Sequence, residues 1–424
     1  MRNIAFRCFA VFLAAFILPM AAWGQDSGFI TLYGHVIDSA TSESLSYASV
    51  NLSGTSLSNV SNTDGSFSLK IPERVSKDSE VLVSHLGYLT GALKVSDFEG
   101  HTSSHPLKIS LVETSIMLDP VMVSAQDPYE LVRKAFSKVA FNYPTERVGM
   151  TAFYREMIRK GSAKYLVINE AVVDIDKASY LSLSSDRLGI YKGRGISNYV
   201  TSDTLFVKLQ GGISTSLEVD LMKNPFLGVS LDEMTETYRF FMDGMATNDG
   251  YTFYKVGFRP NEGVKEIMFR GHIYIETESL AVGRVEVEMD LQGREEEAAR
   301  YFIVKAPAGT RFMANTAKYV VSYKCFEGKW YYDYFRADMG FTTRKRHSLF
   351  RKSFSVTEEM AVTGHKQGGI AIEPASRVRL KDVLSEKVSD FTDEYFWEDY
   401  NIIEPDESIE AIIKKLVRKL GARD

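Results

Sequence analysis

This chain of 424 residues has few cysteines and prolines and only a small excess of one sign of charge. It has 2 Cys and 11 Pro, which excludes a disulfide-rich scaffold and collagen-like or proline-rich disordered chains. Lys and Arg number 50 against 55 Asp and Glu, so the chain is not a strongly basic nucleic-acid binder. After residue 24, no stretch approaches the roughly 20 uninterrupted apolar residues that a membrane-spanning helix needs.

Aromatic residues, in contrast, are abundant. They make up 12% of the chain, with 22 Tyr and 26 Phe, and such side chains favour the pleated, half-buried surfaces of strands. Hydrophobic residues reach 45% and charged residues 25%, as in ordinary globular proteins. The length allows two or three domains, so we expect a mainly β protein with an ample core.

The first residues are typical of a secretory signal peptide. Arg2 and Arg7 precede the apolar run Cys8–Met20, and a small residue stands at Gly24. This pattern predicts residues 1–24 as a signal peptide, cleaved before Gln25. An uncleaved anchor is the alternative, but the short run and its small-residue exit favour the signal.

The predicted mature chain would carry one thiol and a larger negative charge. Loss of Arg2 and Arg7 changes the formal net charge from −5 to −7, and loss of Cys8 leaves Cys325, which we expect to be buried in a strand. Because Gln25 and not cysteine would stand first, no lipid anchor is expected. We therefore predict an exported protein of the periplasm or the outer-membrane periphery, without a transmembrane span.

Short alternating segments follow one another between residues 28 and 113. Asp64-Gly65 separates two of them and predicts a tight hairpin turn with Gly65 at positive φ. Strands at about ten-residue spacing with turns between them predict a β-sandwich. The segments are residues 29–38, 47–52, 57–61, 67–71, 80–85 and 107–111.

Five short motifs follow one another in this region. They are Gly34–Asp38, Leu45–Val50, Gly54-Thr55, Thr63–Leu69 and Ser84–Tyr88. Together they resemble the carboxypeptidase-regulatory-like domain, a transthyretin-like sandwich of secreted and outer-membrane proteins of the Bacteroidetes. The resemblance covers residues 28–113, implies a following strand within the linking segment 114–126, and implies no peptidase activity.

Residues 127–424 predict a second, larger β-rich region. Asp127 can cap a helix that has Pro128 at its first position and ends near Pro144. Residues 232–242 predict another helix. The expected strands are residues 152–157, 165–173, 251–258, 272–276, 284–290, 319–325 and 329–336.

Part of this region carries a fainter resemblance. Tyr254–Phe258, Gly271–Glu276 and Ala281–Glu286 are similar to the repeated hairpins of lipoprotein-localisation-factor-like half-barrels, over about residues 150–345. The resemblance implies a curved antiparallel sheet around a helix, with a place for acyl chains.

The C-terminus predicts an amphipathic helix over residues 405–421. Its apolar stripe includes Ile409, Ile412 and Leu416. Docking on the protein's own core is the favoured interpretation, and peripheral contact with a membrane surface is the alternative.

Motifs for catalysis and metal binding are missing from the sequence. No His is followed three residues later by Glu, and Gly-x-Ser-x-Gly does not occur. Gly193-Arg194-Gly195 lacks the third glycine of a dinucleotide loop. His101 and His105 lie in a Ser-rich loop that does not favour a metal site. We therefore predict no catalytic, cofactor-binding or metal-ligating residue, and no zinc carboxypeptidase activity.

Two residue patterns leave room for other functions. The pairs Asp174/Asp176 and Glu286/Glu288 have a spacing that suits paired carboxylates of a glycosidase, although a solvent-facing strand explains them as well. The aromatic clusters 330–336 and 395–400 suit either a core or a ligand surface.

The leading hypothesis is a non-enzymatic cell-envelope binding or assembly protein whose second domain holds an apolar or extended ligand. Its expected partners are envelope proteins or that ligand, with no nucleic acid and no cofactor. The alternatives are a hydrolase of glycans or peptides with unrecognised carboxylates, and a structural module for protein–protein interaction.

Overall fold

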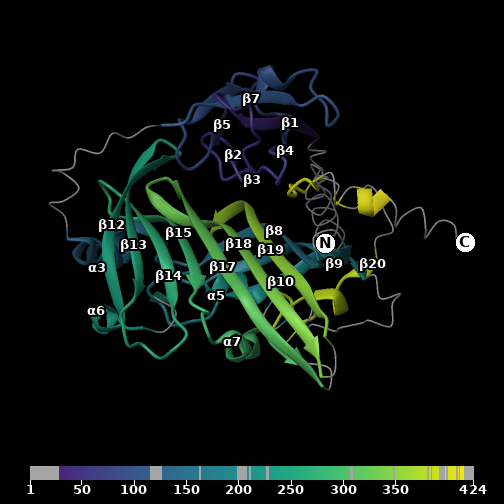
Figure 1. Ribbon diagram of the computed structural model, residues 1–424. Coiled ribbons are helices and arrows are strands. Elements are labelled where there is room, and N and C mark those ends of the chain that lie inside the picture. Colours follow the sequence, from purple (N-terminus) through teal and green to yellow (C-terminus); the bar gives the residue numbers. More distant parts are fainter. Residues whose placement is uncertain are drawn as a thin grey trace, which may run out of the picture.

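The structure is a computed structural model of the chain. It describes residues 28–114, 127–161, 164–197, 208–209, 212–225, 229–305, 309–346, 349–379, 382, 384–390, 397, 400–406, 409 and 411–414. The predicted signal peptide with Gly24 and Gln25, and nearly all of the linking segment 114–126, lie outside these residues. The fold class is confirmed, because a β-sandwich precedes a larger antiparallel sheet (Figure 1).

The sandwich has two small sheets with the strand orders β4-β1-β7 and β3-β2-β5-β6. Alternating side chains from both sheets, such as Val36, Val50, Leu69 and Val83, are fully buried between them. The elements are β1 (Phe29–Asp38), β2 (Ser49–Leu52), β3 (Ser58–Val60), β4 (Ser66–Pro72), β5 (Glu80–Ser84), β6 (Gly91–Lys94), the 3-10 helix η1 (Val95–Phe98) and β7 (Leu107–Leu111).

The turn at Gly65 is confirmed in its backbone but not in its topology. Gly65 has a φ of 79°, and its N–H donates to the Asn62 carbonyl at 3.1 Å. The flanking strands β3 and β4 nevertheless belong to different sheets. The predicted hairpin is therefore wrong, and the turn carries the chain from one sheet to the other.

The large sheet has eleven strands in the order β12-β13-β14-β15-β17-β18-β19-β8-β9-β10-β20. All neighbours are antiparallel except β10 and β20. The strands are β8 (Val148–Lys160), β9 (Lys164–Lys177), β10 (Arg187–Ser197), β12 (Tyr238–Asn248), β13 (Tyr251–Pro260), β14 (Phe269–Glu276), β15 (Val282–Met289), β17 (Thr310–Phe326), β18 (Lys329–Lys345), β19 (Arg351–Gln367) and β20 (Ser389–Asp390).

Helices and two short strands complete this part of the chain. They are α3 (Pro128–Ser137), α4 (Val139–Asn142), α5 (Gly212–Glu218), α6 (Met234–Thr237), α7 (Glu295–Phe302), η3 (Leu384–Glu386) and the pair β11 (Lys208–Leu209) with β16 (Ile303–Lys305). Asp127 caps α3 by accepting from Tyr129 N and Glu130 N, as predicted. None of the helices in the described part of the chain is long and apolar enough to cross a membrane.

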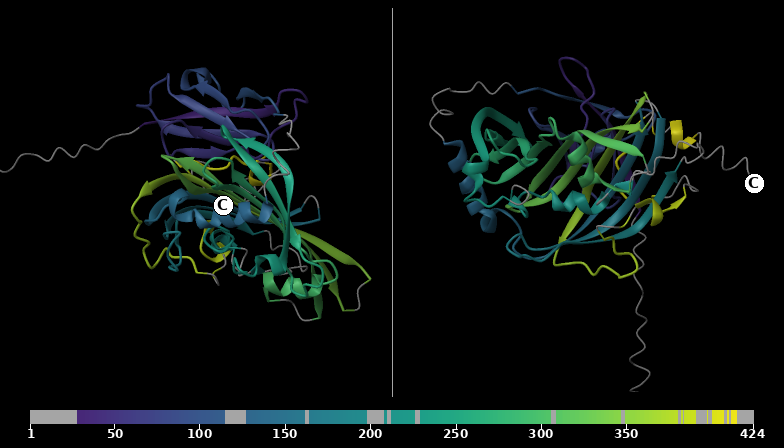
Figure 2. Two further views of the ribbon diagram at one scale, coloured as in Figure 1. Left: turned by 90° about the vertical axis from the view of Figure 1, so that its left-hand side faces the viewer. Right: turned by 60° about the horizontal axis from the view of Figure 1, so that its bottom comes forward.

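The large sheet is curved (Figure 2), and one of its faces holds the main core. α5 packs on this inner face, where Ile213 and Leu217 are buried and the Tyr332 hydroxyl donates to the Ser216 carbonyl at 2.6 Å. The following loop is held by a buried ion pair between Lys177 and Asp220 at 2.7 Å.

The outer face carries the sandwich and a C-terminal segment. Ser58 of the sandwich donates to the Val362 carbonyl of β19 at 2.8 Å. Trp397 and Ile403 are buried against Phe153 and other outer-face side chains, together with Val60 of the sandwich. The C-terminal segment is thus packed between the two β structures.

Two further predictions need correction. The predicted helix 232–242 is one short turn, α6, followed by β12, whose alternating pattern of exposed and half-buried side chains fits a strand at the sheet edge. Gly193-Arg194-Gly195, for which the sequence did not support a dinucleotide loop, lies inside β10. Cys325 is a free thiol, but it is half-buried and not fully buried.

Candidate functional site

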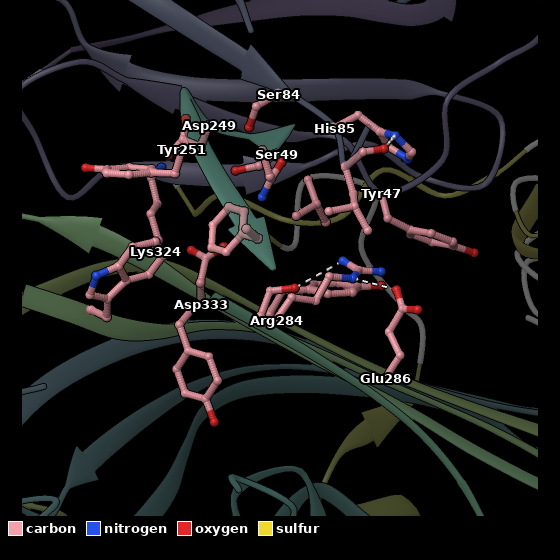
Figure 3. A pocket seen from close by; sticks show the side chains of 18 of the residues that line it. Tyr47, Ser49, Ser84, His85, Asp249, Tyr251, Arg284, Glu286, Lys324 and Asp333 are labelled. Atoms are coloured by element: carbon pink, nitrogen blue, oxygen red, sulfur yellow. Dashed lines mark hydrogen bonds and ion pairs between the residues drawn. The ribbon is translucent and has the colours of Figure 1, made fainter. Parts of the chain in front are cut away.

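A cleft of about 220 Å³ lies where the sandwich meets the outer face of the large sheet (Figure 3). We call it the sandwich–sheet cleft. Ser46, Tyr47, Ser49, Val60, Ser84, His85 and Leu86 of the sandwich line one wall. Asn248, Asp249, Tyr251, Phe253, Arg284, Glu286, Ser322, Tyr323, Lys324, Trp330, Asp333 and Tyr334 of the large sheet line the other.

A β-bulge places an acid in this cleft. Between β17 and β18, Ser322 pairs with Tyr334 and Tyr323 pairs with Tyr332, so Asp333 is the extra residue. Bulges redirect side chains, and here consecutive residues, Asp333 and Tyr334, both line the cleft. A regular strand would have turned one of them to the inner face.

A tight hairpin supplies the second acid. Asp249 and Gly250 connect β12 to β13 with φ values of 50° and 78°, the left-handed conformations of a two-residue hairpin turn. The hairpin end reaches the sandwich, where Gly87 N donates to the Thr247 carbonyl at 2.8 Å. Asp249 therefore stands at the junction of the two cleft walls.

Lys324 and Asp333, like Asp249, are charged groups of the cleft without a direct partner among the described residues. Both are half-buried, and among the described residues neither makes a hydrogen bond or an ion pair. Burial raises the pKa of Asp333 to about 6. The positive charge of Lys324 opposes this rise, and the negative charge of Asp249 adds to it. Burial also lowers the pKa of Lys324, against the attraction of Asp333 and Asp249.

Arg284 is held by its neighbours in the cleft. Its Nε donates to Glu286 Oε1 at 2.7 Å and its Nη1 donates to Ser322 Oγ at 3.2 Å (Figure 3). Burial disfavours the charge on Glu286, but Arg284 and the Tyr274 hydroxyl outweigh it, so its pKa is lowered. Burial, together with Arg284, lowers the pKa of His85. The buried Ser84 hydroxyl has no hydrogen-bond partner among the described residues.

A second depression, of about 450 Å³, lies beside the loop 182–186 on the large sheet. Lys223 Nζ donates to the Ser182 carbonyl at 2.6 Å and Asp186 pairs with Lys177 at 2.6 Å, while the other charged lining residues, Glu218, Arg377 and Arg379, are exposed to solvent. The sandwich–sheet cleft is the stronger candidate because its charged groups Lys324 and Asp333 are half-buried.

The structure separates the predicted carboxylate pairs. Asp176 pairs with Arg147 at 2.5 Å, whereas burial raises the pKa of Asp174. Glu286 is bound to Arg284, and Glu288 lies 3.5 Å from Arg270. The two carboxylates of each pair therefore have different neighbours.

The aromatic cluster 330–336 is divided between the main core and the lining of the cleft. Tyr332 and Phe335 lie in the main core, while Trp330 and Tyr334 line the cleft. Of the second cluster, Trp397 and Tyr400 are described, and both pack with outer-face residues. Across the described residues no group of His, Cys, Asp and Glu is arranged to hold a metal ion, and His101 and His105 lie in a small turn.

One local signal for this cleft is present in the sequence. Asp249-Gly250 between alternating segments is the same hairpin pattern that was recognised at Asp64-Gly65. The bulge at Asp333 leaves no such pattern, because its position depends on how β17 and β18 pair.

The comparison with protein families identifies the N-terminal part. Residues 32–123 match the family model described as the CarboxypepD_reg-like domain. The resemblance drawn from the five sequence motifs is therefore confirmed for this part of the chain. No curated protein matches the chain.

Several solved structures share low similarity with the chain. A DUF1329 family protein from Desulfovibrio piger is 12% identical over 59% of this chain and 95% of its own, with a TM-score of 0.24. A putative outer membrane lipoprotein-sorting protein domain from Vibrio parahaemolyticus is 11% identical over 57% and 93%, with a TM-score of 0.21. A LolA superfamily protein from Nitrosomonas europaea is 7% identical over 58% and 96%, with a TM-score of 0.22. The strand order of the large sheet agrees with the curved antiparallel sheet that the fainter sequence resemblance implies.

Proposed function

We propose that this protein is a non-enzymatic binding protein of the cell envelope that holds an extended ligand at the sandwich–sheet cleft. The observation that carries the proposal is the pair Lys324 and Asp333, two charged groups in a preformed cleft without partners among the described residues. A ligand that donates to the carboxylate and accepts from the ammonium satisfies both groups, which lowers the cost of their burial.

The size and walls of the cleft favour one unit of a longer ligand. A volume of about 220 Å³ lies below the usual range for whole small-molecule ligands, roughly 300–1,000 Å³. The rings of Tyr251 and Trp330, whose centres lie 5.1 Å apart, add apolar surface to the lining beside the charged groups. These features suit a polar sugar or amino-acid unit that projects from an extended chain. The signal-like N-terminus supports an envelope location.

Calorimetric titration with soluble chitooligosaccharides and with a tripeptide library tests this proposal. We expect one of the two classes to bind, and Lys324→Gln to weaken its binding about tenfold or more, because a hydrogen bond to a charged group contributes about 1.5–3 kcal/mol. Lys318→Gln is the matched control, since it is an exposed lysine on the same strand. Binding should also weaken as the pH falls through about 6, where Asp333 takes up a proton.

Failure of both classes to bind would contradict the proposal, and so would equal affinities of wild type and Lys324→Gln. Asp333→Asn distinguishes a role of the carboxylate charge from a role of its shape, because the amide keeps the size of the side chain.

A hydrolase of glycans or peptides is the second candidate. Asp249 and Asp333 line the same cleft, and a carboxylic acid with a pKa of about 6 is suited to donate a proton near neutral pH. The same ligand panel, followed by mass spectrometry, separates the two functions. Cleavage products that disappear in Asp333→Asn would favour the hydrolase.

A further inference from the structure

The connection between β18 and β19 has an unusual charge composition. Residues 339–357 contain no Asp or Glu, whereas Arg344, Lys345, Arg346, Arg351 and Lys352 all lie within nine positions. The chain as a whole has a net charge of −5. A strongly cationic segment therefore stands out against an acidic protein.

The same connection exposes two large apolar side chains. Leu349 is 90% exposed and Phe350 is 81% exposed, among the highest values for large hydrophobic residues in the described chain. Arg344 pairs with Arg351 at the last register position of the two strands, so the cations surround the base of the turn. We call residues 344–346 and 349–352 the β18–β19 tip.

The β18–β19 tip projects away from the rest of the protein. In Figure 1 and in the left-hand view of Figure 2, this end of β18 is the end that lies away from the sandwich.

The charged residues next to the tip change its net positive charge little. Arg311 pairs in register with Arg344, and Glu296 lies 3.8 Å from Arg311.

We propose that the β18–β19 tip docks the protein on an anionic lipid membrane surface. Leu349 and Phe350 would enter the boundary between headgroups and acyl chains, and the five cations around them would face the lipid phosphates. Each Lys or Arg near an anionic surface contributes roughly 1 kcal/mol to binding, and burial of apolar side chains adds to it. The two apolar side chains match the acyl-chain boundary, and the cations around them match the anionic phosphates.

The shape of the tip favours a membrane over an acidic protein. A protein partner would have to supply a pocket for both apolar side chains together with an acidic rim. A bilayer surface accepts a protruding apolar tip without a shaped pocket and presents phosphates on every side. This inference does not depend on the sandwich–sheet cleft.

Cosedimentation of the purified protein with vesicles tests the inference. The protein should sediment with vesicles of phosphatidylglycerol mixed with phosphatidylcholine, and much less with phosphatidylcholine alone. Leu349→Ser/Phe350→Ser should weaken binding about tenfold or more, because burial of such side chains is worth about 1.5–3 kcal/mol each. Lys345→Gln/Arg346→Gln should weaken it by about fivefold per cation and reduce its salt dependence.

Matched variants elsewhere control for general effects. Leu181→Ser/Leu183→Ser changes two exposed leucines in the β9–β10 loop, which the strand register places at the opposite end of the sheet. Arg239→Gln/Lys318→Gln removes two exposed cations away from the tip. Both control variants should bind vesicles like the wild type.

Three outcomes would overturn the inference. The first is no vesicle binding by the wild type at low salt. The second is equal loss in the tip variants and their controls. The third is that Lys345→Gln/Arg346→Gln loses vesicle binding while Leu349→Ser/Phe350→Ser keeps it. This result would point to a soluble acidic partner. Near-identical thermal melts of all variants would show that the tip variants are folded.

Discussion

Two glutamates face each other inside the large sheet domain. Glu156 of β8 and Glu358 of β19 are opposite one another in the register and are 7% and 2% exposed. Asn169 Nδ2 donates to Glu156 Oε1 at 3.0 Å. Burial, reinforced by the neighbouring Glu156, raises the pKa of Glu358 to about 8. Glu358 is therefore protonated in the folded protein at neutral pH.

This raised pKa predicts how stability depends on pH. In the unfolded chain Glu358 titrates near 4.5, so between about 4.5 and 8 the folded state alone holds the proton. The free energy of unfolding must then fall as the pH rises through this window. A tenfold difference in acid constant corresponds to about 1.4 kcal/mol. Glu358→Gln should remove this loss and stabilise the protein at pH 8 and above.

Thermal or urea unfolding from pH 5 to pH 9 measures the effect. Glu297→Gln is a suitable control, because Glu297 is exposed on α7 and should leave the pH profile unchanged. If the unfolding free energy of Glu358→Gln changed with pH as it does in the wild type, the buried carboxyl of Glu358 would not be the cause of the pH dependence.

At the scale of elements, the terminal helix contacts the sheet through Ile409. This side chain is 1% exposed and packs against Met157, Tyr165 and Ile168 on the outer face, with Ile412 partly buried beside it. Asp406 Oδ1 accepts from Ile409 N at 2.8 Å, as expected at the start of a helix. The described residues thus favour docking over membrane contact, while Leu416 lies outside them.

Ile409→Ala should therefore destabilise the protein in plain buffer. Truncating a buried isoleucine costs about 2–5 kcal/mol, and the melting temperature should fall by several degrees. Differential scanning calorimetry measures this change, and Ile412→Ala should have a smaller effect because Ile412 is only partly buried. An unchanged melt for Ile409→Ala would instead support a helix that acts outside the core.

The sequence was informative where the signal is local. Apolar and alternating segments predicted β8, β9, β13, β14, β15 and the centres of β17 and β18. They did not predict β19, because Thr357, Glu358 and Glu359 interrupt its apolar pattern although all three side chains are buried. Capping residues marked α3, since Asp127 and Pro128 act within one turn.

The candidate site was beyond such local reasoning. His85, Asp249, Lys324 and Asp333 are far apart in the chain and meet only through long-range strand pairing and sandwich docking. The acid pairs that the sequence shows, Asp174/Asp176 and Glu286/Glu288, stand two residues apart on single strands. The cleft instead brings together acids from a hairpin turn and from a bulge in another hairpin.

At the scale of the whole molecule, the C-terminal segment joins the sandwich to the large sheet. Asn401 bonds to both backbone groups of Lys70 in β4, accepting from its N–H at 2.7 Å and donating to its carbonyl at 3.1 Å. Asn59 of β3 donates to the Ile402 carbonyl at 2.7 Å. On the other side, Arg155 Nη2 donates to the Ile403 carbonyl at 2.7 Å.

Buried charge on the sheet strengthens this connection. Arg155 pairs with Glu170 at 2.7 Å, Arg194 pairs with the same carboxylate at 2.9 Å, and the guanidinium of Arg194 lies 4.9 Å from the centre of the Trp397 ring. Residues 400–406 and Trp397 therefore bury these charges while they contact the sandwich. Without the segment, a buried ion cluster and the apolar side chains around Phe153 would face water.

We predict that removal of residues 397–424 releases the sandwich from the large sheet. The direct contacts that remain in the described part of the chain are hydrogen bonds of about 0.5–1.5 kcal/mol each, such as Ser58 with Val362 and Gly87 with Thr247, and the packing of Tyr47 against Tyr334 and Arg336. Small-angle scattering should show a larger radius of gyration, and ligand binding at the sandwich–sheet cleft should fall because its two walls separate. Removal of residues 415–424 alone is the control, since it keeps the whole joining segment and Ile409. A truncated protein with the scattering profile of the wild type would show that the sandwich holds its position through its own contacts, and the cleft would then be rigid without help from the C-terminus.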